Sequence, residues 1–119
     1  LPQLISASPA QFGGPGDQWS PEDLLVASVT DCFILTFRAV ARASKLDWSN
    51  LEASAEGLLE RVDRVTRFTK FTLSVTLAVP EGTDIGKAER LLEKAEAACL
   101  ITNSLTAETH LETDVIIAT

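Results

Sequence analysis

Apolar residues between Leu24 and Ala43 point in almost every direction around a 3.6-residue repeat, and this stretch is the most distinctive in the chain. Ser20 is a favourable N-cap, Pro21 suits the first helical position, and two acidic residues follow in the first turn. The pattern predicts one long helix from Pro21 to Lys45. A helix that is apolar on most of its surface is normally buried in the middle of a structure. A narrow polar stripe runs along it through Asp31, Arg38, Arg42 and Lys45.

Two segments after this helix alternate apolar and polar residues with a period of two, which is typical of strands with one solvated face. They run from Leu51 to Glu60 and from Lys70 to Val79. Asp63 and Arg64 lie between them and predict a hairpin turn, and Gly57 indicates a bulge in the first strand. We expect the basic residues around the turn to be solvated and to face the acidic strand opposite, with an anion site as the alternative. These residues are Arg61, Arg64, Arg67 and Lys70.

The remaining elements complete an α+β pattern in a single domain, residues 1–119. Thr83 or Asp84 caps a second helix, whose apolar residues recur three and four positions apart. Residues 109–117 predict a last strand, and residues 4–7 predict a weak edge strand before the long helix. The apolar positions of the second helix are Ile85, Ala88, Leu92, Ala95 and Cys99.

The long helix needs more cover than the predicted sheet can give. It is about 33 Å long at 1.5 Å per residue, and a sheet of three or four strands cannot enclose it on all sides. A second copy of the chain is the simplest source of the missing cover. We therefore predict an obligate homodimer with a large apolar interface.

Composition and charge exclude several classes of partner. The net charge of -7 and the isoelectric point near 4.6 argue against nucleic acid and against anionic membrane surfaces. Asp31 interrupts the longest apolar run, so we predict no helix that spans a membrane. The first residues lack a basic region followed by an apolar stretch, so no secretory signal is expected. These features favour a cytoplasmic protein.

The candidate chemistry rests on two cysteines, Cys32 and Cys99, which lie 67 positions apart. Together with the one histidine, His110, they do not make a metal site, and we expect no cofactor. They are either two free thiols or a redox pair in a reducing compartment. By itself, a cysteine in an apolar helix is more often an inert core residue, and a strand histidine is more often a surface residue than a catalytic base. Residues 12–17 are interpreted as a loop, because they lack the spacing of a phosphate-binding motif.

Both cysteines lie in segments that resemble those of a known family. The long helix opens with Ser20-Pro21-Glu22-Asp23-Leu24, and Cys32-Phe33 follows after seven residues. This resembles the N/S-P-E-x-L-(x)7-C-F segment of the OsmC/Ohr family, the osmotically inducible and organic hydroperoxide resistance proteins. Residues 98–105 look like that family's second cysteine box, x-C-P-V-S-N-A-L, with Leu100 in place of the proline. The resemblance implies an OsmC-like fold, in which an antiparallel sheet is wrapped around a buried central helix in an intertwined homodimer.

The resemblance also implies a thiol peroxidase that acts on organic hydroperoxides or H2O2. Cys32 would take an oxygen atom from the peroxide and become a sulfenic acid. Cys99 would resolve it to a disulfide, which an external dithiol would then reduce. One alternative is a non-catalytic relative that binds a small apolar or electrophilic ligand in a pocket at the dimer interface. Another is a purely structural dimerisation module with two inert cysteines.

In this family an Arg from the N-terminal strand region, held by the Glu of the S-P-E segment, lowers the pKa of the nucleophile. Glu22 matches that Glu, and no Arg in this chain matches the Arg. Three alternatives follow for the cation that activates Cys32. It lies on residues before Leu1, or one of the hairpin arginines replaces it, or it is lost together with the activity. Ten helical residues, about 15 Å, separate Glu22 from Cys32. We therefore expect Glu22 to serve the thiol of a partner subunit, or to be only a favourable first-turn acid.

Overall fold

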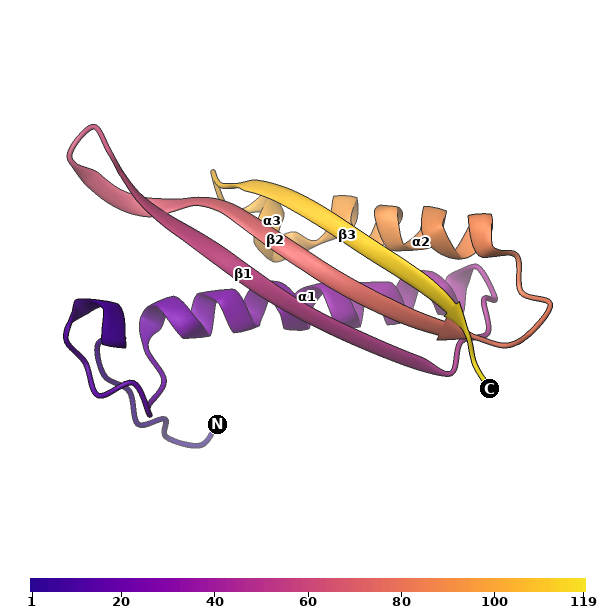
Figure 1. Cartoon of the computed structure of the whole chain (residues 1–119), viewed down its shortest axis with the longest axis horizontal. Coiled ribbons are helices and arrows are strands. Elements are labelled where there is room, and N and C mark those ends of the chain that lie inside the picture. Colours follow the sequence, from indigo (N-terminus) through magenta and orange to yellow (C-terminus); the bar gives the residue numbers. More distant parts are fainter.

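The computed structural model describes all 119 residues and confirms an α+β arrangement of two layers. A three-stranded sheet forms one layer, and two helices that lie side by side form the other (Figure 1). The elements in chain order are η1 (Ala10–Phe12), α1 (Pro21–Ala43), β1 (Asn50–Val62), β2 (Val65–Val79), α2 (Ile85–Ala98), α3 (Leu100–Asn103) and β3 (Glu108–Ile117).

Side-chain caps fix the start of both long helices. The Ser20 hydroxyl accepts a hydrogen bond from the backbone N–H of Asp23 at 3.0 Å, and Pro21 occupies the first turn of α1. Asp84 accepts the N–H of Lys87 at 3.1 Å and caps α2. Each bond satisfies one of the amide groups that a helix leaves unpaired at its start. The predicted caps of both helices are therefore confirmed, with Asp84 as the cap of the second.

The hairpin of β1 and β2 has the predicted turn. Asp63 and Arg64 both adopt positive φ, 50° and 68°, which matches the twist of a two-residue hairpin loop. The pairing register shifts between Leu58 and Leu59, and the residue without a partner is Thr69 of β2. The bulge predicted at Gly57 in the first strand therefore lies in the second strand. Beyond Glu108, where β3 begins, the hairpin continues without a third strand and reaches past the rest of the sheet (Figure 1).

The expectation of an antiparallel sheet is wrong for one of its two pairings. β1 and β2 are antiparallel, but β3 pairs with β2 in parallel, in the order β1-β2-β3. The reason is the connection, because α2 carries the chain back to the starting end of β2 before β3 begins. The predicted edge strand at residues 4–7 does not form, and only an isolated bridge joins Ser6 to Trp19.

The core lies between the sheet and the helices. It takes one face of α1, the inward residues of β2 and the apolar face of α2. Its fully buried large side chains include Phe33, Phe37, Phe71, Leu73, Leu77 and Leu92. Within this chain the sheet covers only that face of α1 and is not wrapped around the helix, because three strands are too few to enclose it. Leu35, on another face, is 52% exposed.

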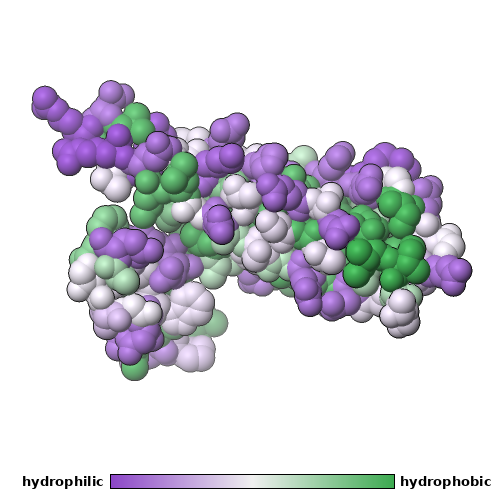
Figure 2. Space-filling model, viewed as in Figure 1, coloured by the Kyte–Doolittle hydropathy of each residue, from purple (hydrophilic) through white to green (hydrophobic).

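The surface of the chain is larger than its mass predicts. A compact monomer of 12.8 kDa exposes roughly 6,300 Å², whereas this chain exposes 7795 Å². The excess is about 1,500 Å², which exceeds the ~800 Å² that one partner buries in a standard interface. The radius of gyration, 16.4 Å, is also above the ~13.5 Å of a compact domain of this length. Apolar side chains open to solvent are visible in Figure 2.

α1 has the length and hydropathy of a helix that crosses a membrane, with a mean hydropathy of 1.8 over 18 residues. The prediction that Asp31 excludes it on composition alone was therefore too strict. Core helices of soluble proteins have the same character, and Val29, Phe33, Phe37 and Ala41 of α1 are packed into the core here.

Candidate active site

The two cysteines lie where α1 meets the end of α2. Cys32 is half-buried on α1, directly before the core residue Phe33. Cys99 is fully buried at the junction of α2 and α3, where its extended backbone (φ -64°, ψ 113°) turns the chain from one helix into the next. The Cys99 thiol is one of the groups that lower the pKa of Cys32, so the two thiols lie near each other. Packing of α1 against α2 and α3 thus brings together two thiols that are 67 positions apart.

The surroundings of Cys32 favour its thiolate form. Partial burial raises the pKa of Cys32, but hydrogen-bond donors outweigh this effect and hold the pKa below the usual value of a thiol. The donors are the backbone N–H of Ile101, the Cys99 thiol, the Thr36 hydroxyl and the backbone N–H of Leu100. Two of them are amides in the first turn of α3, which have no partner within that short helix. The Cys32 sulfur lies 3.9 Å from Thr36 Oγ1.

Every group that lowers the pKa of Cys32 is uncharged. The hairpin arginines do not reach this thiol within one chain. Arg67 instead lines a small cavity of about 180 Å³ with Leu25 and Leu105, and Arg61 and Arg64 lie at the end of the hairpin. A thiolate at Cys32 is therefore stabilised here by hydrogen bonds, without an ion pair.

The structure does not bring Glu22 to the cysteines. Glu22 lies in the first turn of α1 and lines a groove of about 330 Å³ with Glu56, Gly57 and Phe68. Ten helical residues separate it from Cys32, about 15 Å along the axis. His110 lies on the solvated face of β3, 3.5 Å from Glu112, and its side chain is 54% exposed. It has the surroundings of a surface residue, as expected.

Thr36 and the amides of Leu100 and Ile101 were not foreseen from the sequence. Thr36 was open to prediction, because residues four positions apart lie on the same face of a helix. The amides were not, because nothing in the local pattern showed that the backbone turns at Cys99 and starts a new helix. The segment from Leu100 to Leu105 was expected to be irregular, and its first four residues form α3.

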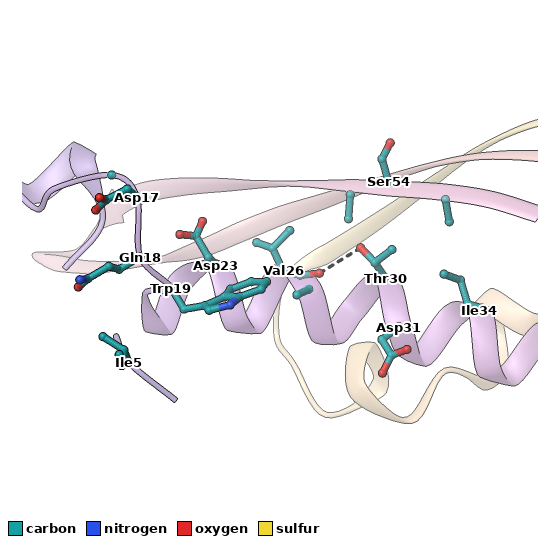
Figure 3. Close-up of a pocket in the computed structure, with 14 residues that line it drawn as sticks. Ile5, Asp17, Gln18, Trp19, Asp23, Val26, Thr30, Asp31, Ile34 and Ser54 are labelled. Atoms are coloured by element: carbon teal, nitrogen blue, oxygen red, sulfur yellow. Dashed lines mark hydrogen bonds between the residues drawn. The ribbon is translucent and has the colours of Figure 1, made fainter. Parts of the chain in front are cut away.

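A groove larger than the two already described lies elsewhere in the chain. It has a volume of about 930 Å³ and runs between the N-terminal segment, α1 and β1 (Figure 3). Trp19, Val26 and Ile34 contribute apolar surface, and Asp17 and Asp31 contribute carboxylates. Neither cysteine lines it, so it is separate from the thiol site.

Comparison with known proteins gives the family. Residues 14–114 match the family model described as OsmC-like protein. The chain belongs to the OsmC-like protein family. It is 24% identical over 107 residues to the Bacillus subtilis protein YmaD, covering 87% of this chain and 71% of that protein. It is 28% identical over 93 residues to peroxiredoxin OsmC of Escherichia coli, covering 78% of this chain and 64% of that protein. This OsmC-like chain thus spans less than two thirds of the length of the peroxiredoxin.

Solved structures of the family share the fold. The OsmC-like protein VCA0330 of Vibrio cholerae superposes with a TM-score of 0.80 at 23% identity, covering 91% of this chain and 74% of that one. An organic hydroperoxide resistance protein OsmC of Legionella pneumophila gives a TM-score of 0.77 at 26% identity, covering 98% and 82%. These matches confirm the OsmC-like fold. The names of these relatives support a peroxidase-like role for the family.

Proposed function

We propose that this OsmC-like chain is a cysteine-based peroxidase that reduces organic hydroperoxides or H2O2. The observation that carries the proposal is that Cys32, whose pKa is lowered by nearby hydrogen-bond donors, lies near the buried Cys99, which is one of them. A peroxidase of this kind needs a thiolate that a substrate can reach and a second thiol beside it. Cys32 is the more accessible of the two, and Cys99 is shielded from direct oxidation.

The proposed reaction has three steps. The Cys32 thiolate attacks the distal oxygen of the peroxide, the O–O bond breaks, and the alcohol or water leaves with a proton while Cys32 becomes a sulfenic acid. The Cys99 sulfur, as a thiolate, then attacks the Cys32 sulfur, so that a disulfide forms and water leaves with the proton from Cys99. An external dithiol exchanges with this disulfide, becomes a disulfide itself and returns both cysteines to thiols. We propose that this occurs in the cytoplasm, where thiols are kept reduced.

The donors around Cys32 suit the first step. Amide N–H groups and hydroxyls that stabilise a thiolate also stabilise an oxyanion on the same sulfur. Formation of the disulfide requires the two Cβ atoms to lie about 3.5–4.5 Å apart, and the effect of Cys99 on the pKa of Cys32 places the two thiols in the same site.

We propose that the active species is a homodimer. The excess surface of about 1,500 Å² and the uncovered apolar face of α1 support a second copy as its cover. In such a dimer Glu22 serves the Cys32 of the partner subunit. A chain with Glu22→Ala and a chain with Cys32→Ser should each lack activity, and heterodimers formed by mixing them should recover part of it. Absence of any recovery in verified heterodimers rules out the shared site.

A thiol titration tests the peroxidase. The reduced chain is titrated before and after one equivalent of cumene hydroperoxide. We expect two thiols per chain to be lost, no loss in Cys32→Ser, and a sulfenic acid that a dimedone reagent traps in Cys99→Ser. Two thiols that remain after treatment refute the peroxidase.

The uncharged surroundings of Cys32 favour a second candidate function. Without a cation beside it, the thiol can serve to hold a small apolar or electrophilic ligand at the dimer interface rather than to reduce peroxide. In that case the titration shows two unreactive thiols with peroxide, whereas an electrophile such as N-ethylmaleimide still modifies Cys32.

A further inference from the structure

We infer that Asn103 is a positioning residue of the thiol site. Its side chain binds the Ala97 carbonyl, which leaves the backbone N–H of Ile101 free to face Cys32. This inference rests on the proposed function, because it concerns the thiolate on which that function depends. It can be tested without peroxide, so its failure and that of the peroxidase are distinguishable.

The helical hydrogen bonds are interrupted at Cys99. α2 ends at Ala98, Cys99 adopts an extended conformation with ψ of 113°, and α3 begins at Leu100 (Figure 1). The Cys99 N–H bonds to the Glu96 carbonyl at 3.2 Å, three residues back instead of the four of a regular α-helix. Because of this break, the first amides of α3 do not continue the hydrogen-bond pattern of α2.

Asn103 binds one of the acceptors that the break leaves open. In a continuous α-helix, the Ala97 carbonyl would accept the N–H of Ile101, four residues later. Here the side-chain amide of Asn103 donates to that carbonyl instead, at 3.0 Å. The backbone N–H of Asn103 bonds to the Cys99 carbonyl, also at 3.0 Å. Asn103 therefore holds the chain on both sides of the break.

The amide that this exchange leaves free belongs to the thiol site. α1 packs against α3, and the half-buried Cys32 lies on α1. Burial raises the pKa of Cys32, and the Ile101 N–H has the largest of the opposing effects. If that N–H turned to the Ala97 carbonyl, the sulfur would lose this donor. Asn103 thus acts on the thiol through Ile101.

No proline enforces the break in this chain. A proline at the first position of α3 would keep the preceding residue extended, and it would lack the N–H that continues α2. That position is occupied by Leu100, and Ala97 and Ala98 precede Cys99. Alanine and leucine are good helix formers, so the local sequence favours one continuous helix. The side chain of Asn103 supplies the bond that keeps the two helices apart.

Asn103→Ala tests the effect on the thiol. Alkylation by iodoacetamide over a range of pH, with the Cys32 peptide identified by mass spectrometry, measures the pKa of Cys32. We expect this pKa to rise and the fraction of thiolate below it to fall about three- to tenfold, because a hydrogen bond to a charged group is lost and water replaces part of it. Ser49→Ala is the matched control, because it removes an exposed side-chain bond to the Ala78 carbonyl. It should leave the pH profile unchanged.

A proline at position 100 tests whether Asn103 acts by holding the break. Leu100→Pro fits the structure, because proline is favoured at the first helical position and Cys99 before it is already extended. In this background Asn103→Ala should raise the pKa of Cys32 by less than about half as much as in the unmodified chain. In a Leu100→Ala background, which keeps the N–H of residue 100, the effect of Asn103→Ala should be undiminished.

The backbone of Cys99 reports the break directly. The ¹³Cα chemical shift of a residue differs between extended and helical backbone. In Asn103→Ala the shift of Cys99 should move toward the helical value, and the Ile101 N–H should exchange more slowly with solvent because it bonds to the Ala97 carbonyl. In Leu100→Pro/Asn103→Ala the shift of Cys99 should keep its extended value.

Three outcomes overturn the inference. A pKa of Cys32 that changes no more in Asn103→Ala than in Ser49→Ala refutes it. Equal changes with and without proline at position 100 also refute it, because Asn103 then acts by another route than the break. A Cys99 backbone that stays extended in Asn103→Ala refutes it as well. None of these measurements uses peroxide, so the thiol titration decides the proposed function separately.

Discussion

Removal of the Thr36 hydroxyl tests whether hydrogen bonds alone activate Cys32. Thr36 Oγ1 lies 3.9 Å from the Cys32 sulfur and is one of the donors that lower the pKa of Cys32. Thr36→Val keeps the shape of the side chain and removes the donor. The pKa of Cys32 should therefore rise, and less thiolate should be present at neutral pH.

The size of the effect follows from the geometry. A neutral hydrogen bond contributes about 0.5–1.5 kcal/mol, and the long distance to sulfur and partial exposure to water put this one at the lower end. At pH values below the pKa of Cys32, a loss of about 0.5 kcal/mol lowers the fraction of thiolate about twofold. Because the thiolate is the nucleophile, the rate of attack on peroxide should fall by a similar factor.

Alkylation by iodoacetamide measures the thiolate across a range of pH. Thr36→Ser keeps the hydroxyl and should behave like the unmodified chain. Thr30→Val is the matched control, because Thr30 is on the same helix and its hydroxyl donates to the Val26 carbonyl at 3.2 Å rather than to Cys32. If Thr36→Val and Thr30→Val give the same pH profile, Thr36 has no part in activating the thiol.

Two predictions concern stability. Gly57→Ala should destabilise the chain by about 1 kcal/mol in urea unfolding, because a Cβ there would lie 2.6 Å from the Phe68 ring, whereas Gly86→Ala in the first turn of α2 should stabilise it by about 0.5 kcal/mol. Equal effects of the two changes would contradict this. Burial raises the pKa of Glu96, and the charge of His110 opposes this effect. The folded state therefore binds the proton of Glu96 more tightly than the unfolded state does. Stability should decrease as the pH rises from about 4 through the pKa of Glu96 in the folded state. Glu96→Gln should remove this part of the pH dependence, by less than about 1 kcal/mol because water screens the group; an unchanged pH dependence would refute it.

Local sequence patterns were enough to predict most of the elements. The caps at Ser20 and Asp84, the hairpin turn at Asp63 and the buried face of α2 depend on contacts within a few residues. Such contacts are set by neighbours along the chain, so spacing and residue type reveal them. The parallel pairing of β3 with β2 was not predicted. It depends on the end of the sheet to which α2 returns the chain, and no local sequence pattern indicates that position.

The candidate site divides in the same way. Motif resemblance selected Cys32, Cys99 and Glu22, but it carried no information on which groups stand around the thiol. The structure shows Thr36 and two backbone amides there, and no charged group. Backbone amides have no signature in a sequence, because every residue other than proline has one.

The sequence by itself determined the long apolar helix and the segments that carry the two cysteines, since these follow from hydropathy and local spacing. Only the tertiary structure decided that the two thiols lie near each other and that uncharged donors surround Cys32. These features arise where segments far apart in the sequence come together, and the forces that pack them act through space rather than along the chain.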